Sequence, residues 1–186
     1  MRIVAGRFRG RRLASPEGKE AVRPTSDRAR EAIFNVLMHR FQGRGFSLIG
    51  ARVVDAFAGT GAMGLEALSR GAAHVTFLEN NRSALAALKA NVQAVNAEGE
   101  TRVEQTDATR PPRPTQPCQL AFLDPPYEDG LLEPALAGLL SGGWLAPGAI
   151  VVCEGPITVD LTAPEGMEHV DERRYGKAKV TFLRVT

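Results

Sequence analysis

The four residues Asp124-Pro125-Pro126-Tyr127 follow directly after the apolar run 120–123. Proline fixes φ and has no N–H, so the two prolines stiffen the backbone and leave the Pro125 carbonyl available as an acceptor. The Asp124 carboxylate is a second acceptor, and Tyr127 offers a ring on which a base can stack. Two acceptors can hold both hydrogens of an exocyclic amine and turn its lone pair toward an electrophilic methyl group. The set therefore suits amine methylation, although the same residues also fit a strand followed by an ordinary Asp-Pro turn.

A glycine-rich segment about seventy residues upstream has the pattern of a strand, a turn and a helix. Residues 52–55 are mostly apolar, residues 56–64 carry the glycines, and residues 62–70 have helical spacing. The series Gly59-x-Gly61-x-x-Gly64 matches the dinucleotide-binding fingerprint, so a nicotinamide or flavin enzyme stays an alternative. Asp55, at the turn, would repel a pyrophosphate but attract the ammonium group of an amino acid. The segment therefore favours a cationic ligand.

Acidic residues end four of the predicted strands. These strands cover residues 52–55, 74–79, 101–107 and 120–124, and their terminal acids are Asp55, Glu79, Asp107 and Asp124. The carboxyl ends of parallel strands border the ligand crevice of an open α/β sheet, so we expect the four acids to converge there. Glu79 is suited to accept from both hydroxyls of a ribose, and Asp107 from an adenine amino group. Any one of them alone could be a turn residue.

Helical patterns separate the predicted strands. Apolar residues recur at helical spacing in 82–96 and 131–140, and alternation of strands with helices predicts a parallel sheet. Residues 149–154 read as a fifth strand, and 169–175 with 178–185 as a hairpin closed by a glycine-containing turn. We expect Trp144 to pack in the core, and the proline-rich segment 111–117 to connect two strands of one sheet.

Together these motifs resemble the class I S-adenosylmethionine-dependent methyltransferases over residues 51–127. The resemblance implies an α/β, Rossmann-like fold with a seven-stranded, mostly parallel sheet and a C-terminal antiparallel hairpin. It implies S-adenosylmethionine as the cofactor and an amine-methylating motif formed by Asp124, Pro125, Pro126 and Tyr127. The cofactor-binding residues that it implies are Asp55, Phe57, Gly59, Gly61, Glu79, Asp107 and Ala108.

Length and composition limit the alternatives. The 186 residues suit one domain, 1–186, which can bury about 70% of the surface of the unfolded chain. We expect a cytoplasmic protein, because no apolar run is long enough to span a bilayer and the arginine-rich start lacks the apolar core of a signal peptide. Two cysteines and three histidines without ligand spacing predict neither a disulfide framework nor a metal site.

Positive charge is concentrated at the start of the chain. The first 30 residues hold nine basic and three acidic residues, so they carry +6 while the remaining 156 carry −4. Alternating arginines in an extended strand would share one face and suit a phosphate backbone. A solvated edge strand protected by charge is the alternative. The candidate RNA-binding residues are Arg7, Arg9, Arg11, Arg12, Arg23 and Arg28.

The segment after these arginines begins with a proline and a hydroxyl cap and continues as a helix with Ala29, Ile33, Val36 and Leu37 on one face. Residues 9–13 (RGRRL) and 23–31 (RPTSDRARE) closely resemble the bacterial small-subunit ribosomal RNA guanine-N2 methyltransferases. This resemblance implies methylation of the N2 amine of one guanosine in 16S rRNA, presented in the small ribosomal subunit. We expect the enzyme to be a monomer. Residues 1–40 would then be an RNA-binding extension.

Other classes of methyltransferase share parts of this sequence pattern. An adenine-N6 methyltransferase acting on DNA or RNA shares the Asp-Pro-Pro-Tyr motif, but a DNA enzyme normally needs a target-recognition insert, for which no segment is long enough. A protein glutamine methyltransferase usually begins this motif with Asn, and a module that only binds RNA has no need of four acids at strand ends. Cys118, in Pro117-Cys118-Gln119, resembles the nucleophile of cytosine-C5 methyltransferases but precedes its strand, at the edge opposite the predicted crevice.

Overall fold

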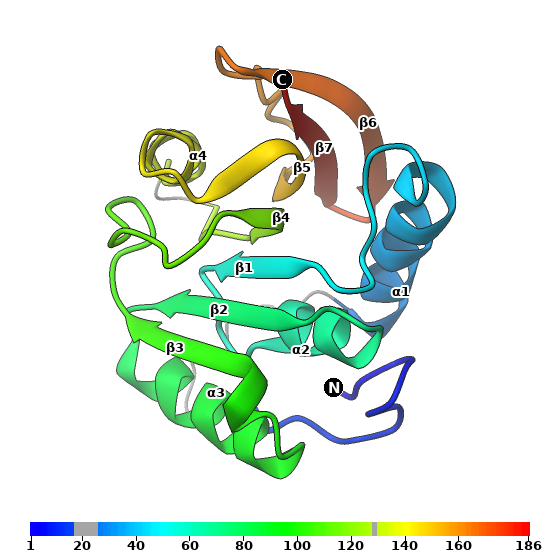
Figure 1. Ribbon diagram of the computed structural model, residues 1–186, viewed down its shortest axis with the longest axis vertical. Helices are drawn as coiled ribbons and strands as arrows, with labels where there is room; N and C mark the ends of the chain where they lie inside the picture. The colour runs from blue at the N-terminus through cyan, green and yellow to red at the C-terminus, as the bar shows by residue number, and fades with distance from the viewer. Residues whose placement is uncertain (17–25, 128–129) are drawn as a thin grey trace.

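The computed structural model describes residues 1–16, 26–127 and 130–186, and its centre is one seven-stranded sheet of order β3-β2-β1-β4-β5-β7-β6 (Figure 1). Strands β1 to β5 pair in parallel, whereas β7 pairs antiparallel with both β5 and β6. The predicted sheet and closing hairpin are therefore confirmed. The strand bounds are β1 Arg52–Ala56, β2 His74–Glu79, β3 Thr101–Gln105, β4 Cys118–Leu123, β5 Leu145–Pro156, β6 Met167–Tyr175 and β7 Ala178–Val185.

Helices cover both faces of this sheet. Successive strand residues point to opposite faces, and Val53 accordingly packs in one buried cluster while Val54 packs in the other. The first cluster includes side chains of α1, α2 and α3, and the second includes side chains of α4. The helical elements are α1 Asp27–Val36, the π-helix Leu37–Phe41, α2 Ala62–Ser69, α3 Arg82–Ala94, the short 3₁₀ helix Glu98–Glu100 and α4 Leu132–Ser141.

The order of the strands reverses between β1 and β4. From β1 the chain moves outward through β2 to β3, and it then returns to place β4 on the other side of β1. Leu123, the last residue of β4, pairs with Ala56 of β1 and with Cys153 of β5. The residues that follow, Phe57 and Asp124, therefore leave neighbouring strand ends at this switch point, where α/β sheets bind ligands.

A buried carboxylate, Glu66 of α2, joins three segments of the chain. Its side chain is fully buried and accepts hydrogen bonds from the N–H groups of Val4 (2.8 Å) and Ala5 (3.0 Å). It also pairs with the guanidinium groups of Arg30 in α1 (3.4 Å) and Arg70 after α2 (2.8 Å). Glu66 thus holds the N-terminal segment and α1 against α2.

The N-terminal arginines do not lie along an extended strand, so that prediction is wrong. Residues 5–10 form turns, and an isolated bridge between Arg2 and Arg12 closes the segment into a loop. Gly6 has φ of 77°, and a Cβ there would lie 1.9 Å from the carbonyl oxygen of Ser69. Backbone hydrogen bonding to α2, including Arg7 N–H to Ser69 O at 2.8 Å, bends the chain here.

The inward face of α1 also differs from the prediction. The buried side chains are Arg30, Ile33, Phe34 and Leu37, whereas Ala29 and Val36 are only partly buried. Arginine is rarely buried unless it is paired, and here Arg30 pairs with Glu66 and with Asp27. An orientation of α1 that is predicted from its apolar residues alone is therefore rotated about the helix axis from the observed orientation. The Ser26 cap, which accepts from Ala29 N–H, is as predicted.

Other expectations are confirmed. Trp144 is buried, and its indole N–H donates to the carbonyl of Pro112 at 2.8 Å, which fixes the connector between β3 and β4 against the core. Cys118 begins β4, at the opposite end of this strand from Asp124. Burial raises the pKa of its thiol to about 12. It is therefore a poor nucleophile.

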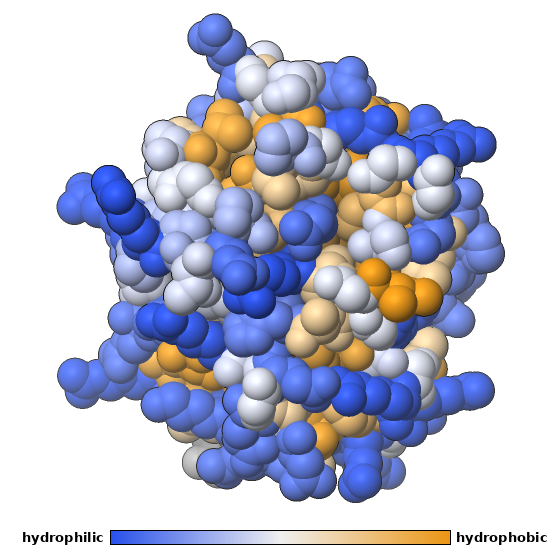
Figure 2. Space-filling view, viewed as in Figure 1, coloured by the Kyte–Doolittle hydropathy of each residue, from blue (hydrophilic) through white to orange (hydrophobic). Residues whose placement is uncertain are grey.

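The face drawn in Figure 2 is mostly hydrophilic, with small and separate hydrophobic patches. Within the part of the chain that the structure describes, no helix is long and apolar enough to cross a membrane.

The Glu66 network generates a prediction on stability. Replacing Glu66 with Ala should lower the free energy of unfolding by about 3–5 kcal/mol, because it removes the buried partner of two guanidinium groups. Urea denaturation would measure this loss. Glu31→Ala, at an exposed position on α1, is the control and should change the value by no more than about 0.5 kcal/mol. Equal stabilities of the two variants would contradict the role of Glu66.

Candidate active site

The predicted amine-binding motif lies at the end of β4 and lines a cavity of about 890 Å³. Pro125 is buried, whereas Tyr127 leaves 44% of its surface exposed, as a ring that stacks on a base requires. The Tyr127 hydroxyl donates a hydrogen bond to Oε1 of Glu154 at 3.1 Å. The hydrogen bond fixes one end of the ring. The cavity thus offers an aromatic surface beside two carboxylates, Asp124 and Glu154.

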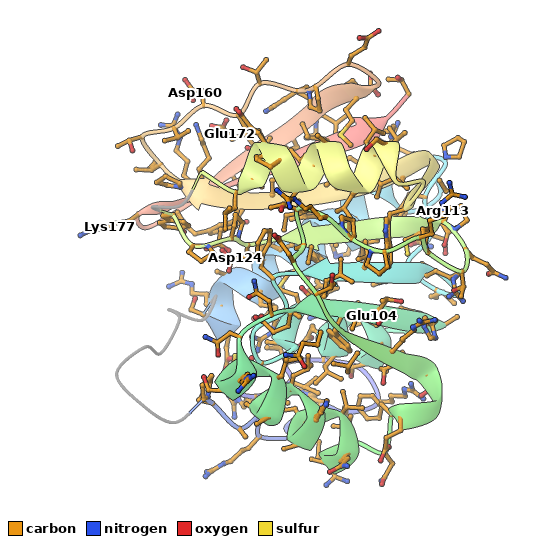
Figure 3. The ribbon with its side chains drawn as sticks, turned by 90° about the vertical axis from the view of Figure 1, so that its left-hand side faces the viewer. Glu104, Arg113, Asp124, Asp160, Glu172 and Lys177 are labelled. Atoms are coloured by element: carbon orange, nitrogen blue, oxygen red, sulfur yellow. The ribbon has the colours of Figure 1, made fainter. Side chains whose placement is uncertain are left out.

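Two other elements complete the cavity. Arg28 and Ala29 come from the first turn of α1, and Arg174 and Lys177 come from the end of β6 and from the turn before β7. Figure 3 shows Asp124 and Lys177 on one side of the molecule and Arg113 on the other. Three exposed cations thus border a cavity that has carboxylates inside it, an arrangement that suits a phosphate-bearing ligand whose inserted part carries hydrogen-bond donors.

The glycine-rich turn after β1 has the backbone of a ligand-binding loop. Phe57 has φ of 62°, an uncommon value for a residue other than glycine, and Gly61 has φ of 79° at the start of α2. A Cβ on Gly64 would lie 2.4 Å from the ring of Phe77, so this glycine lets α2 pack directly on β2. Gly64 N–H also donates to Asp55 at 2.9 Å.

Asp55 lies near the carboxyl end of β1, with only 4% of its surface exposed. Burial raises its pKa to about 8; the Gly64 hydrogen bond opposes this shift, and the nearby Glu79 carboxylate adds to it. A positively charged ligand group would reverse the effect, because an opposite charge favours the ionised form. The site is therefore suited to a cation, as its sequence suggests.

Glu79 is held by three backbone N–H groups. Oε1 accepts from Asn80 at 2.9 Å and Asn81 at 2.8 Å, and Oε2 accepts from Gly59 at 2.7 Å. A carboxylate has about four acceptor positions, so about one, on Oε2, is left for a ligand. The expectation that Glu79 accepts from both ribose hydroxyls stays a prediction, and this arrangement leaves room for one of the two.

Asp107 and Ala108 follow β3 at the same sheet edge. Asp107 is exposed, and its Oδ1 accepts from the N–H (2.9 Å) and hydroxyl (2.8 Å) of Thr109, which lower its pKa. Ala108 is buried in the cluster that contains Ala56 and Leu78. The two residues therefore end near the glycine-rich turn, and their contact with an adenine stays a prediction.

The structure separates the predicted RNA-binding arginines. Arg28 is exposed at the cavity. Arg7 instead pairs with Glu100 at 2.6 Å, and Glu100 comes just before β3, so this pair lies at the amino ends of the parallel strands, opposite the cavity. Arg9, Arg11 and Arg12 are exposed on the N-terminal loop. Arg23 lies outside the described residues.

Three charged residues that line the cavity were not among the predicted site residues: Glu154, Arg174 and Lys177. Glu154 could have been found, because it is an acid at the end of a predicted strand, as the four selected acids are. The two cations belong to the predicted hairpin, but only the pairing of β7 with β5 brings its tip to the cavity.

The sheet order, the glycine-rich turn and the acids at the strand ends define a Rossmann-like methyltransferase. The family model described as "Conserved hypothetical protein 95" matches residues 1–184. The chain belongs to this family.

Named relatives agree with this assignment. The chain is 35% identical to the ribosomal RNA small subunit methyltransferase D of Haemophilus influenzae over 180 residues, which cover 95% of this chain and 89% of the relative. It is 38% identical to the Escherichia coli protein of the same name over 158 residues, which cover 84% of this chain and 75% of the relative. A solved structure described as the putative methyltransferase yhhF from Escherichia coli superposes with a TM-score of 0.83 at 34% identity, covering 100% of this chain and 97% of that one.

The raised pKa of Asp55 generates a prediction on pH. The protonated form is favoured in the folded state, so this contribution to stability is complete below pH about 3.8 and is lost as the pH rises through about 8. Asp55→Asn cannot ionise, and its melting temperature should therefore exceed that of the wild type by more at pH 8 than at pH 5.

Added S-adenosylmethionine should have the opposite effect. It should raise the melting temperature of the wild type at pH 8 by more than that of Asp55→Asn, because the variant lacks the charge that pairs with an ammonium group. Thermal unfolding with and without the cofactor measures both effects. A gap between the two proteins that does not change with pH would contradict the raised pKa.

Proposed function

We propose that this protein transfers a methyl group from S-adenosylmethionine to the exocyclic N2 amine of one guanosine in the 16S rRNA of the small ribosomal subunit. The observation that carries the proposal is the position of Asp124-Pro125-Pro126-Tyr127, at the switch point of the sheet and inside a cavity bordered by cations. The relatives named as small-subunit ribosomal RNA methyltransferases support the substrate class. In this proposal the protein acts as a monomer in the cytoplasm.

Residues at the carboxyl ends of β1 and β2 fit the two ends of the proposed cofactor. Asp55 is a buried carboxylate suited to the ammonium group, and Glu79 keeps about one acceptor position for a ribose hydroxyl. The positive φ angles of Phe57 and Gly61 turn the loop that follows Asp55 and leads into α2. The chemistry that S-adenosylmethionine supplies when bound is an electrophilic methyl group on sulfur, whose S–C bond breaks as the N–C bond forms.

The protein's own part is to hold the amine in line with that bond. The target base leaves its stack and lies on the Tyr127 ring, while Asp124 and the Pro125 carbonyl accept from its NH2 group. The amine proton passes to Asp124 or to water after the nitrogen has been methylated. Because Asp124 follows the residue that pairs with Ala56, the held amine lies next to the glycine-rich turn. Such positioning can contribute roughly 7–11 kcal/mol to catalysis.

Asp124→Ala should reduce turnover by at least about 100-fold, because an acceptor aimed at the reacting group is lost. Its affinity for S-adenosylmethionine should stay close to that of the wild type, since Asp55 and Glu79 are intact. Methyl transfer to small subunits and calorimetric cofactor binding measure the two quantities. Cys118→Ala is the control and should retain turnover; a variant at Asp124 with normal turnover would remove this residue from the mechanism.

Binding to RNA should depend on the cations at the cavity. Changing Arg28, Arg174 and Lys177 together to Ala should flatten the dependence of log affinity on log salt by up to about 2–3 units, because each lost phosphate contact reduces the slope by about 0.7–0.9. The matched triple variant of Arg7, Arg9 and Arg11 should change the slope less, because these three arginines are not among the residues that line the cavity. Equal slopes for the cavity variant and the wild type would contradict this assignment.

A further inference from the structure

Glu154 is an acid inside the substrate cavity for which the chemistry above has no use. It lies in β5, where Cys153 pairs with Leu123, so that Glu154 and Asp124 follow paired residues on adjacent parallel strands. Its other neighbour is Val180 of β7. The two carboxylates therefore enter the cavity from neighbouring positions of the sheet.

A carboxylate at this place opposes the binding of RNA unless it meets a hydrogen-bond donor. The exposed cations Arg28, Arg174 and Lys177 attract phosphate, whereas a negative charge inside the cavity repels it and repels any acceptor on the inserted base. Glu154 accepts from the Tyr127 hydroxyl through Oε1. A carboxylate has about four acceptor positions, so it can accept from several donors at once.

Guanine and adenine differ in the atom that would face such a carboxylate. In guanine the exocyclic N2 amine is adjacent to N1–H, a donor, so two neighbouring acceptor groups can bind both. In adenine the exocyclic N6 amine is adjacent to N1 without a hydrogen, which is an acceptor. Enzymes that extrude a base read its Watson–Crick edge in this way.

We propose that Glu154 accepts the N1–H of the target base and so selects guanine over adenine, while Asp124 and the Pro125 carbonyl hold the adjacent amine. This inference rests on the proposed function and adds the residue that sets its base specificity. An adenine placed with its amine at Asp124 would direct the lone pair of N1 at the Glu154 carboxylate. A site that hydrogen-bonds a substrate N–H rejects an analogue that lacks it, because the hydrogen bond is lost and two acceptors then face each other.

The competing role for Glu154 is to orient the Tyr127 ring through their hydrogen bond. The two roles differ in what they predict for a base with the same amine but no N1–H. 2-Aminopurine is such a base, since it keeps the N2 amine and has an acceptor at N1. An orienting role would alter the rates with guanine and 2-aminopurine together, whereas recognition of N1–H changes their ratio.

The test compares small subunits assembled from 16S RNA that carries either guanosine or 2-aminopurine at the position that accepts the methyl group. The wild type should prefer guanosine in kcat/KM by at least about 10-fold, as expected for a hydrogen bond to a charged group. Glu154→Gln should bring the ratio near one, because an amide can donate to N1 of 2-aminopurine. Glu154→Ala should also lower it.

Tyr127→Phe is the matched control, because it removes the hydrogen bond to Glu154 and keeps the ring. It should slow both substrates and preserve the wild-type ratio. A ratio that Glu154→Gln leaves unchanged, or that Tyr127→Phe lowers equally, would overturn the role of Glu154 while guanine methylation stands. A wild-type protein that transfers no methyl group to guanine N2 would overturn the proposed function, and this inference with it.

Discussion

The register of three parallel strands is the constraint on which the site depends. Because Leu123 pairs with both Ala56 and Cys153, the chain leaves β1 and β4 at the same level, and β5 passes beside them at Glu154. Successive side chains along a strand point to opposite faces of the sheet. A shift of one residue in the register of β4 would therefore move Asp124 away from the glycine-rich turn and from Glu154. The glycine-rich turn and the proposed amine-binding motif are thus brought together by the backbone hydrogen bonds of the sheet.

Buried charge organises the part of the molecule around this sheet. Glu66 connects the N-terminal loop and α1 to α2, and α2 is the helix that begins at the glycine-rich turn. The first turn of α1 supplies Arg28 to the cavity. The same ionic network therefore positions a wall of the candidate substrate cavity and the helix that follows the glycine-rich turn. The cost of removing Glu66 and Arg30 from water is offset because each of these two ions makes several hydrogen bonds.

Much of the fold could be predicted from the sequence, because strand and helix periodicities are local properties. The strand ends carrying Asp55, Glu79 and Asp124 followed from that pattern with the rule for parallel sheets. The inward face of Arg30 could not, since burial of an arginine depends on a carboxylate 36 residues away. The bend at Gly6 likewise depends on contact with Ser69. Lys177 reaches the cavity only through pairing of distant strands.

The chemical identity of the methylated product distinguishes the proposed reaction from its alternatives. The most direct measurement incubates the protein with methyl-labelled S-adenosylmethionine and small subunits from cells that lack this enzyme, then digests the RNA and identifies the labelled nucleoside. We expect the label in N2-methylguanosine of 16S RNA. Label in N6-methyladenosine, or on DNA or protein with none on the subunits, would contradict it.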